Sequence, residues 1–177
     1  MINLVEQINK YVNEGYNEIY ASAKVAQDII LSYLFKSEYK NNVTIKGGVV
    51  MYNLTNDKRR ATIDIDLDLI KIYLADDNLY KIFTSHKLCG ITIIVDTFGI
   101  TDLKHQDYKG KRIPIIIRDT FNNEISTKID IGVHTEYNII QDELYFDTCI
   151  DKEQIKLLVN SKEQIFVEKI IPIIKFG

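Results

Sequence analysis

The chain has 177 residues, 46% of them hydrophobic and 27% charged, which is typical of a soluble globular protein of about one domain. The formal net charge of −3 excludes the overall basic character of a dedicated nucleic-acid-binding protein, although it leaves room for a local basic patch. We find no signal peptide and no run of roughly eighteen apolar residues that could cross a membrane, and we therefore expect a cytoplasmic protein.

The N-terminal part of the chain, over about residues 1–42, is expected to be helical. Apolar residues between Tyr16 and Tyr39 recur at the spacing of one helix face. Asn17 is a suitable N-cap for this helix, and the Asn41-Asn42 pair is suited to ending it. We predict helices over this part of the chain, including the run from Tyr16 to Tyr39, followed by a sheet region from about residue 43.

A glycine pair, Gly47-Gly48, lies between a short apolar strand at Val43–Ile45 and a brief helix at Val49–Leu54. Glycine lets the backbone approach a phosphate closely, and the amides at a helix N-terminus attract its negative charge. An ordinary tight turn is the alternative explanation for the pair. If the pair binds phosphate, a branched side chain at Gly48 should block binding and leave the fold largely intact.

The most informative segment follows a polar, basic connection at residues 56–60. From Ile63 to Leu69, apolar residues alternate with Asp64, Asp66 and Asp68, which indicates a strand with one acidic face. Like charges on one face repel, and a divalent cation relieves the repulsion; oxygen ligands select a hard ion such as Mg²⁺. The alternative is a solvated edge strand, for which aspartate is poorly suited. We expect Asp68 to lie past the site, either solvated or paired with a basic residue.

Further elements are predicted in the second half of the chain. A helix is expected at Asp76–Lys87, and strands at Ile91–Phe98 and Arg112–Arg118. Pro114 favours an edge position or a strand start for the second of these strands. The basic loop at residues 104–112 is either a solvated hairpin tip or a contact for RNA.

The last strand with clear alternation is Ser126–Val133, which carries Asp130 on its polar face. The Asn122-Asn123 turn joins it to the preceding strand in a hairpin. Residues from about 142 to 177 are expected to be mainly helical, ending in a closing helix at Lys162–Phe176. Helices flanking a small mixed sheet make the whole chain one α+β or α/β domain, with the sheet over about residues 43–134.

Three aspartates are the candidate site. Asp64 and Asp66 project from one face of their strand, and Asp130 can lie opposite them if the two strands are neighbours. Three converging carboxylates can hold two Mg²⁺ ions about 3.5–4 Å apart, an arrangement that serves phosphoryl or nucleotidyl transfer.

These motifs resemble a known family. Gly47-Gly48 followed by residues 60–67 (RATIDIDL) resembles the first motif of the DNA polymerase β-like nucleotidyltransferase superfamily. The fuller pattern, KGG followed by RRATIDIDL, is similar to the AbiEii/AbiGii toxin family of bacterial abortive-infection and toxin–antitoxin systems. Residues 128–132 (KIDIG) fit the family's third-carboxylate strand, and residues 166–170 (FVEKI) fit, more loosely, a helix bearing a lysine. The resemblance implies a polymerase β-like nucleotidyltransferase fold of class α+β.

The resemblance also implies roles for single residues. Asp64, Asp66 and Asp130 would be catalytic and would bind Mg²⁺, with Asp130 also a candidate general base. The residues expected to contact the nucleotide are Gly47, Gly48, Arg60, Lys169 and Lys175. In the wider superfamily a Gly-Ser pair often stands where this chain has Gly-Gly, so the serine hydroxyl is missing here.

The activity implied by the resemblance is transfer of a nucleoside monophosphate from an NTP to an acceptor hydroxyl. RNA, and tRNA in particular, is the expected acceptor, and the implied biological role is a toxin with a cognate antitoxin. The alternatives are a non-catalytic nucleotide- or partner-binding module of the same fold, and a nucleotidyltransferase that modifies protein. Members of this branch continue into a helical C-terminal region, whereas this chain ends at Gly177. We therefore expect either the catalytic half of a longer protein or a short natural form.

Overall fold

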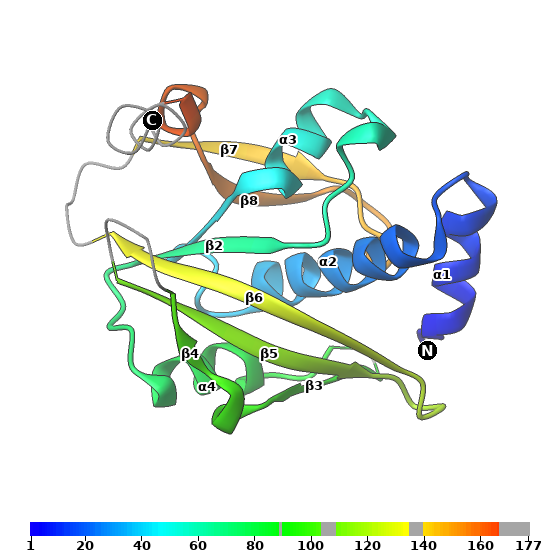
Figure 1. Ribbon diagram of the computed structural model, residues 1–177, viewed down its shortest axis with the longest axis horizontal. Helices are drawn as coiled ribbons and strands as arrows, with labels where there is room; N and C mark the ends of the chain where they lie inside the picture. Colours follow the sequence, from blue (N-terminus) through cyan, green and yellow to red (C-terminus); the bar gives the residue numbers. More distant parts are fainter. Residues whose placement is uncertain (89, 104–108, 135–139, 167–177) are drawn as a thin grey trace.

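In the described part of the chain, the molecule, seen here in a computed structural model, is built around one eight-stranded mixed sheet (Figure 1). The structure describes residues 1–88, 90–103, 109–134 and 140–166. The strands are β1 (Val43–Lys46), β2 (Ile65–Ile70), β3 (Thr92–Val95), β4 (Thr101–Asp102), β5 (Gly110–Arg118), β6 (Glu124–His134), β7 (Gln141–Phe146) and β8 (Ile155–Asn160). They follow the order β3-β5-β6-β2-β1-β8-β7, and β4 also pairs with β5. The predicted α+β class with a mixed sheet is confirmed.

The helices in the described residues agree with most of the sequence-based expectations. They are α1 (Leu4–Asn13), α2 (Glu18–Lys36), α3 (Gly47–Thr55), α4 (Asp76–Thr84) and the short 3-10 helices η1 (Lys58–Arg60) and η2 (Thr97–Gly99). The side chain of Asn17 caps α2 by accepting a hydrogen bond of 2.9 Å from the backbone amide of Tyr20. None of the helices in the described ranges has the length and apolar character that crossing a membrane requires.

The centre of the sheet is formed by β1, β2 and β6. Strand β1 pairs with β2 in antiparallel orientation, and β2 pairs with β6 in parallel orientation. One row of this pairing joins Ile45, Leu67 and Ile131, whose side chains are all fully buried. These residues belong to one hydrophobic core that also contains most of the buried side chains of α2, which runs beside the central strands in Figure 1. The alternate positions along the same strands therefore place the aspartates on the other face.

The prediction that Pro114 marks an edge or the start of a strand is wrong. Strand β5 is an interior strand with β6 on one side and β3 and β4 on the other, and Pro114 lies in its middle. The carbonyl of Pro114 accepts a hydrogen bond of 3.0 Å from the amide of Asp96, so its backbone faces the β3–β4 side. On that side β3 ends at Val95 and β4 begins at Thr101, and η2 lies between them. The proline is tolerated because the neighbouring strand is interrupted where its missing amide would have donated.

The expected helical segment from about residue 142 is wrong for its first part. Strands β7 and β8 form an antiparallel hairpin there, and β8 also pairs in parallel with β1. Ile155, Leu157 and Val159 are buried at alternate positions, which is the period of a strand. Of the closing helix predicted at 162–176, the structure describes residues 162–166, which are helical. Lys169 and Lys175 lie outside the described residues.

Candidate active site

A row of four charged residues crosses the polar face of the sheet, and we refer to Lys46, Asp66, Asp130 and Arg112 as the charged row. The strand pairing sets Lys46 opposite Asp66, Asp66 opposite Asp130, and Asp130 opposite Arg112. Residues directly opposite one another in paired strands project from the same face of a sheet. The structure therefore brings together two of the three predicted carboxylates on neighbouring strands.

The third predicted carboxylate, Asp64, lies just before the start of β2, the strand that carries Asp66. It directly precedes β2, two residues before Asp66, and its side chain is about half exposed. Its Oδ1 lies 3.6 Å from the Nζ of Lys128, a neighbour of Asp130 on β6. Asp64 is thus close enough to Asp66 for their charges to interact, in the more solvated part of the site.

Asp130 is held by a two-pronged ion pair with Arg112. The Nε of Arg112 donates to Oδ1 of Asp130 at 2.7 Å, and Nη2 donates to Oδ2 at 2.8 Å. This is the parallel arrangement in which a guanidinium binds a carboxylate most strongly. The hydrogen bonds and charge of Asp130 raise the pKa of Arg112 above its ordinary value. Both oxygens of Asp130 are therefore engaged by a cation of the protein itself.

Asp68 is paired with Lys46 in the interior of the protein. The Nζ of Lys46 lies 2.7 Å from Oδ1 of Asp68, and the exposed fractions of the two side chains are only 9% and 0%. Of the two roles expected for Asp68, pairing with a basic residue is confirmed and solvation is wrong. Buried charges persist only when they are paired, so each of these two side chains depends on the other.

The pKa of Asp66, which lies in the middle of the charged row, is raised well above its ordinary value. Burial raises its pKa first, and the charges of Asp130, Asp64 and Asp68 raise it further, while Lys46 lowers it; the result is a pKa of about 6. Desolvation and nearby negative charge both penalise the carboxylate form. A cation bound at Asp66 would relieve this penalty.

The glycine pair forms the start of α3 and lies next to the carboxylate of Asp66. Gly47 has a φ of +69°, a backbone conformation that favours glycine, and a Cβ at this position would overlap Oδ2 of Asp66. A Cβ at Gly48 would lie 2.7 Å from the Cβ of Thr62, which is too close. The expectation that a branched residue at Gly48 leaves the fold largely intact is therefore wrong, because Thr62 or α3 would have to move. Both glycines are therefore required for packing, because a side chain at either position would collide with Asp66 or Thr62.

Replacing Gly47 with Ala should lower the free energy of unfolding by about 2–4 kcal/mol, since the substitution combines a left-handed backbone with an overlap on Asp66. Gly15 is a matched control because its φ is +99°, while the nearest atom to its Cβ would be the Nζ of Lys58 at 4.0 Å. Gly15→Ala should therefore lose only the conformational part, about 1–2 kcal/mol. Urea denaturation of both variants measures the difference, and equal losses would contradict the overlap.

The carboxylates of the site suit a hard divalent cation, provided that the protein's own cations move away from them. Carboxylate oxygens are the ligands that Mg²⁺ prefers, and Asp66 and Asp130 are direct neighbours on one face. Within the described residues, however, no three His, Cys, Asp or Glu side chains are already gathered in a group that could hold a metal ion. Asp130 is turned to Arg112 and Asp64 to Lys128. The residues fit a metal if these protein cations give way to it.

Sequence reasoning assigned no role to Lys46 and placed Arg112 at the end of a basic loop, as part of a solvated tip or an RNA contact, whereas the structure places Arg112 on β5 opposite Asp130. Lys46 stands directly before the glycine pair, where the end of β1 must face the end of β2. The predicted Asn122-Asn123 turn would have set Asp130 opposite Ile115, whereas the observed connection is residues 119–123, and this register sets Asp130 opposite Arg112. Of the other expected nucleotide contacts, Arg60 is exposed at the end of η1 and the structure does not bring it into the charged row.

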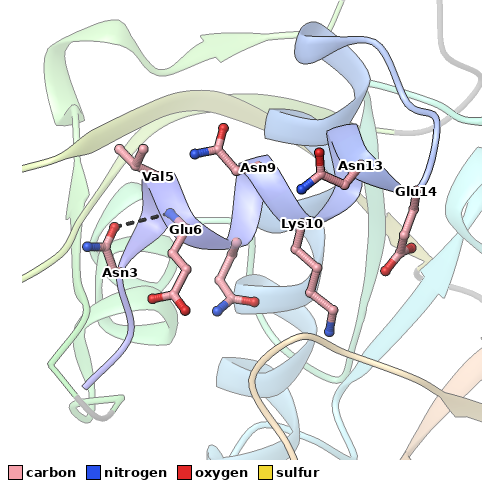
Figure 2. A pocket seen from close by; sticks show the side chains of 8 residues that line it. Asn3, Val5, Glu6, Asn9, Lys10, Asn13 and Glu14 are labelled. Carbon is pink, nitrogen blue, oxygen red and sulfur yellow. Dashed lines mark hydrogen bonds between the residues drawn. The ribbon is translucent and has the colours of Figure 1, made fainter.

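The surface also carries a hollow of about 670 Å³ along α1. Figure 2 shows that the residues lining it come from α1 and its two caps and are of polar types apart from Val5, and that the Oδ1 of Asn3 accepts the 3.2 Å hydrogen bond from the amide of Glu6 that caps this helix. None of the residues lining it belongs to the charged row. The hollow is therefore a feature separate from the candidate active site.

Comparison with known protein families gives one assignment. The model of the family described as "Nucleotidyl transferase AbiEii toxin, Type IV TA system" matches residues 29–176, which is most of the chain. The match covers the glycine pair, the acidic strand and the strand that bears Asp130. A comparison with curated proteins found no match.

Proposed function

Because the chain belongs to the AbiEii family of nucleotidyl transferase toxins of type IV toxin–antitoxin systems, we propose that it transfers a nucleoside monophosphate from an NTP to a hydroxyl group of RNA. We propose tRNA as the acceptor and the cytoplasm as the place of action. The observation that carries the proposal is the charged row, in which Asp66 and Asp130 are neighbours and Asp66 lies against the first glycine of α3. Carboxylates beside a glycine-started helix suit a nucleoside triphosphate and its cation.

We assign Asp64, Asp66 and Asp130 as ligands of Mg²⁺, with two ions the expected number. When bound, Mg²⁺ would neutralise the charge of the phosphates and of the leaving pyrophosphate. The glycines and the first amides of α3 would bind the triphosphate, because these amides have no partner within the helix. The side chains proposed to reach phosphate oxygens are Arg60, Lys169 and Lys175.

The chemical step needs positioning more than covalent help from the protein. The acceptor oxygen forms a bond to the α-phosphorus, the bond from that phosphorus to the bridging oxygen of the β-phosphate breaks, and pyrophosphate leaves. The proton of the acceptor hydroxyl passes to Asp130 as general base, or to water. Asp130 can serve as base only after its bond to Arg112 is loosened, because both its oxygens accept hydrogen bonds from that guanidinium.

Label transfer tests the proposal. The purified protein is incubated with Mg²⁺, total RNA and each of the four NTPs carrying a label on the α-phosphate. We expect label from at least one NTP to enter material that RNase destroys and protease does not, and EDTA to prevent it. Absence of transfer from every NTP would contradict the proposal. Label in material that only protease destroys would instead identify a protein acceptor.

A second candidate function is binding of a nucleotide or a partner without catalysis. The ion pairs of the site favour it, because Arg112 and Lys128 already neutralise Asp130 and Asp64 without a metal. Melting the protein with each NTP and Mg²⁺ separates this candidate from the enzyme, since a ligand that binds the native state raises the melting temperature. Nucleotide-dependent stabilisation without label transfer would favour the binding module. The family also implies an antitoxin, whose presence should relieve any growth arrest caused by the chain.

A further inference from the structure

The ion pair between Arg112 and Asp130 has the features of a replaceable contact. Asp130 is mostly buried, with 16% of its side chain exposed, whereas Arg112 has 40% exposed. The carboxylate is therefore the more buried partner, and the guanidinium is the partner nearer to solvent. Asp66, the direct neighbour of Asp130, lies on the side of Asp130 opposite to Arg112.

A divalent cation shared by Asp66 and Asp130 would compete with Arg112. Both oxygens of Asp130 are taken by the guanidinium, at 2.7 and 2.8 Å. A metal ion at the same carboxylate would meet like charge a few ångströms away, which is strongly unfavourable in a partly buried site. Metal binding must therefore displace the arginine or accept the repulsion.

We infer that Arg112 is a positioning residue that occupies Asp130 in the metal-free protein and sets the affinity of the site for divalent metal by competing with it. The inference rests on the proposed function, because it takes Asp130 as a metal ligand. Arg112 also offsets part of the negative charge that gathers at Asp66 and Asp130 in the metal-free protein. It acts on the metal through Asp130.

The same strand pair supplies a matched control. Arg118 is the other arginine of β5, and it lies opposite Glu124 of β6 just as Arg112 lies opposite Asp130. The Nε of Arg118 donates to Glu124 at 2.6 Å, and the side chain is 44% exposed, close to the value for Arg112. Arg118→Gln therefore removes an equivalent cross-strand ion pair outside the charged row.

The test is titration of the full chain with Mn²⁺ alone, by calorimetry, in nucleotide-free buffer at pH 7.5. Arg112→Gln should bind Mn²⁺ about tenfold more tightly than the parent, or bind it measurably where the parent does not, because a competing charge is removed. Arg118→Gln should bind Mn²⁺ as the parent does. An unchanged or weakened affinity of Arg112→Gln would overturn the inference, and so would an equal gain in Arg118→Gln.

A second pair of variants separates competition from a change in folding. In the Asp130→Asn background, adding Arg112→Gln should leave the Mn²⁺ affinity unchanged, since the contested carboxylate is already gone. A gain that persists in that background would overturn competition at Asp130. Melting curves without metal confirm that each variant is folded before titration.

The outcome also distinguishes this inference from the proposed function. If the parent transfers label with Mg²⁺ and Arg112→Gln shows no tighter binding of Mn²⁺, the inference fails and the enzyme stands. If neither protein binds Mn²⁺ or transfers label, both the inference and the proposed function fail.

Discussion

Replacing Asp66 with Asn should abolish nucleotidyl transfer and, in metal-free buffer at pH 7, make the protein more stable. The loss of transfer should be about a thousandfold or more, because a central ligand of the cation that offsets phosphate charge is removed. The gain in stability follows from the burial of Asp66 among three other carboxylates, which raises its pKa to about 6. Asparagine has a similar volume and carries no charge.

The raised pKa of Asp66 also predicts how stability depends on pH. The folded protein binds a proton at Asp66 more tightly than the unfolded chain, whose pKa is near 3.8. The contribution of Asp66 to the free energy of unfolding of the parent should therefore fall as pH rises from about 4 to about 6, and stay lower above that range. The shift corresponds to an upper limit of about 3 kcal/mol. The Asn variant lacks this decline.

Urea denaturation in EDTA, at pH 4.5 and at pH 7, measures the effect for parent and variant. The variant should be more stable than the parent at pH 7, and the two should lie closer together at pH 4.5. Clear destabilisation of Asp66→Asn at pH 7 would mean that the carboxylate is a structural hydrogen-bond acceptor, and the enzyme interpretation would then have to be abandoned.

Replacing Lys46 with Met should lower the free energy of unfolding by about 3–5 kcal/mol. The substitution keeps the long apolar stem and removes the ammonium 2.7 Å from Asp68, whose side chain is fully buried. Removing one member of a buried ion pair leaves the other charge in a low-dielectric interior, which costs far more than the pair contributes as a whole.

Lys156 provides the control for this prediction. Its Nζ lies 2.8 Å from Oε2 of Glu143, almost the same separation as in the Lys46–Asp68 pair, but its side chain is 44% exposed and that of Glu143 is 59% exposed. Lys156→Met should change stability little, because solvent screens an exposed pair. The double variant Lys46→Met, Asp68→Leu should recover part of the lost stability. Equal effects of the two lysine substitutions would show that burial does not govern the Lys46 pair.

The elements with strong periodicity could be predicted from the sequence, and the errors have local physical causes. The capped helix after Asn17 and the alternating strand through Asp66 lie where the pattern predicted them. Pro114 misled because the tolerance of a proline depends on the neighbouring strand, which leaves the sheet beside it. The hairpin of β7 and β8 was missed because its first strand is polar at most positions and shows no apolar alternation.

Sequence reasoning identified the carboxylates of the candidate site but not the cations that pair with them. The motif located Asp64, Asp66 and Asp130, and their placement near one another follows from strands that are neighbours. The cations that meet these carboxylates depend on the exact pairing of four strands, which no single motif contains. Lys46 and Arg112 are therefore residues that the fold, and not the motif, assigns to the site.

The order of strands in the sheet has a consequence for how the chain is made. β1 lies near the middle of the sheet, yet the strand on its far side from β2 is β8, which is synthesised more than a hundred residues later. Until Ile155–Asn160 has left the ribosome, the outer edge of β1 stays open and can pair with other chains. A nascent or prematurely terminated chain could thus contain every residue of the charged row and still lack a closed sheet. Such chains should aggregate, so the cell would be exposed to the complete protein and not to its fragments.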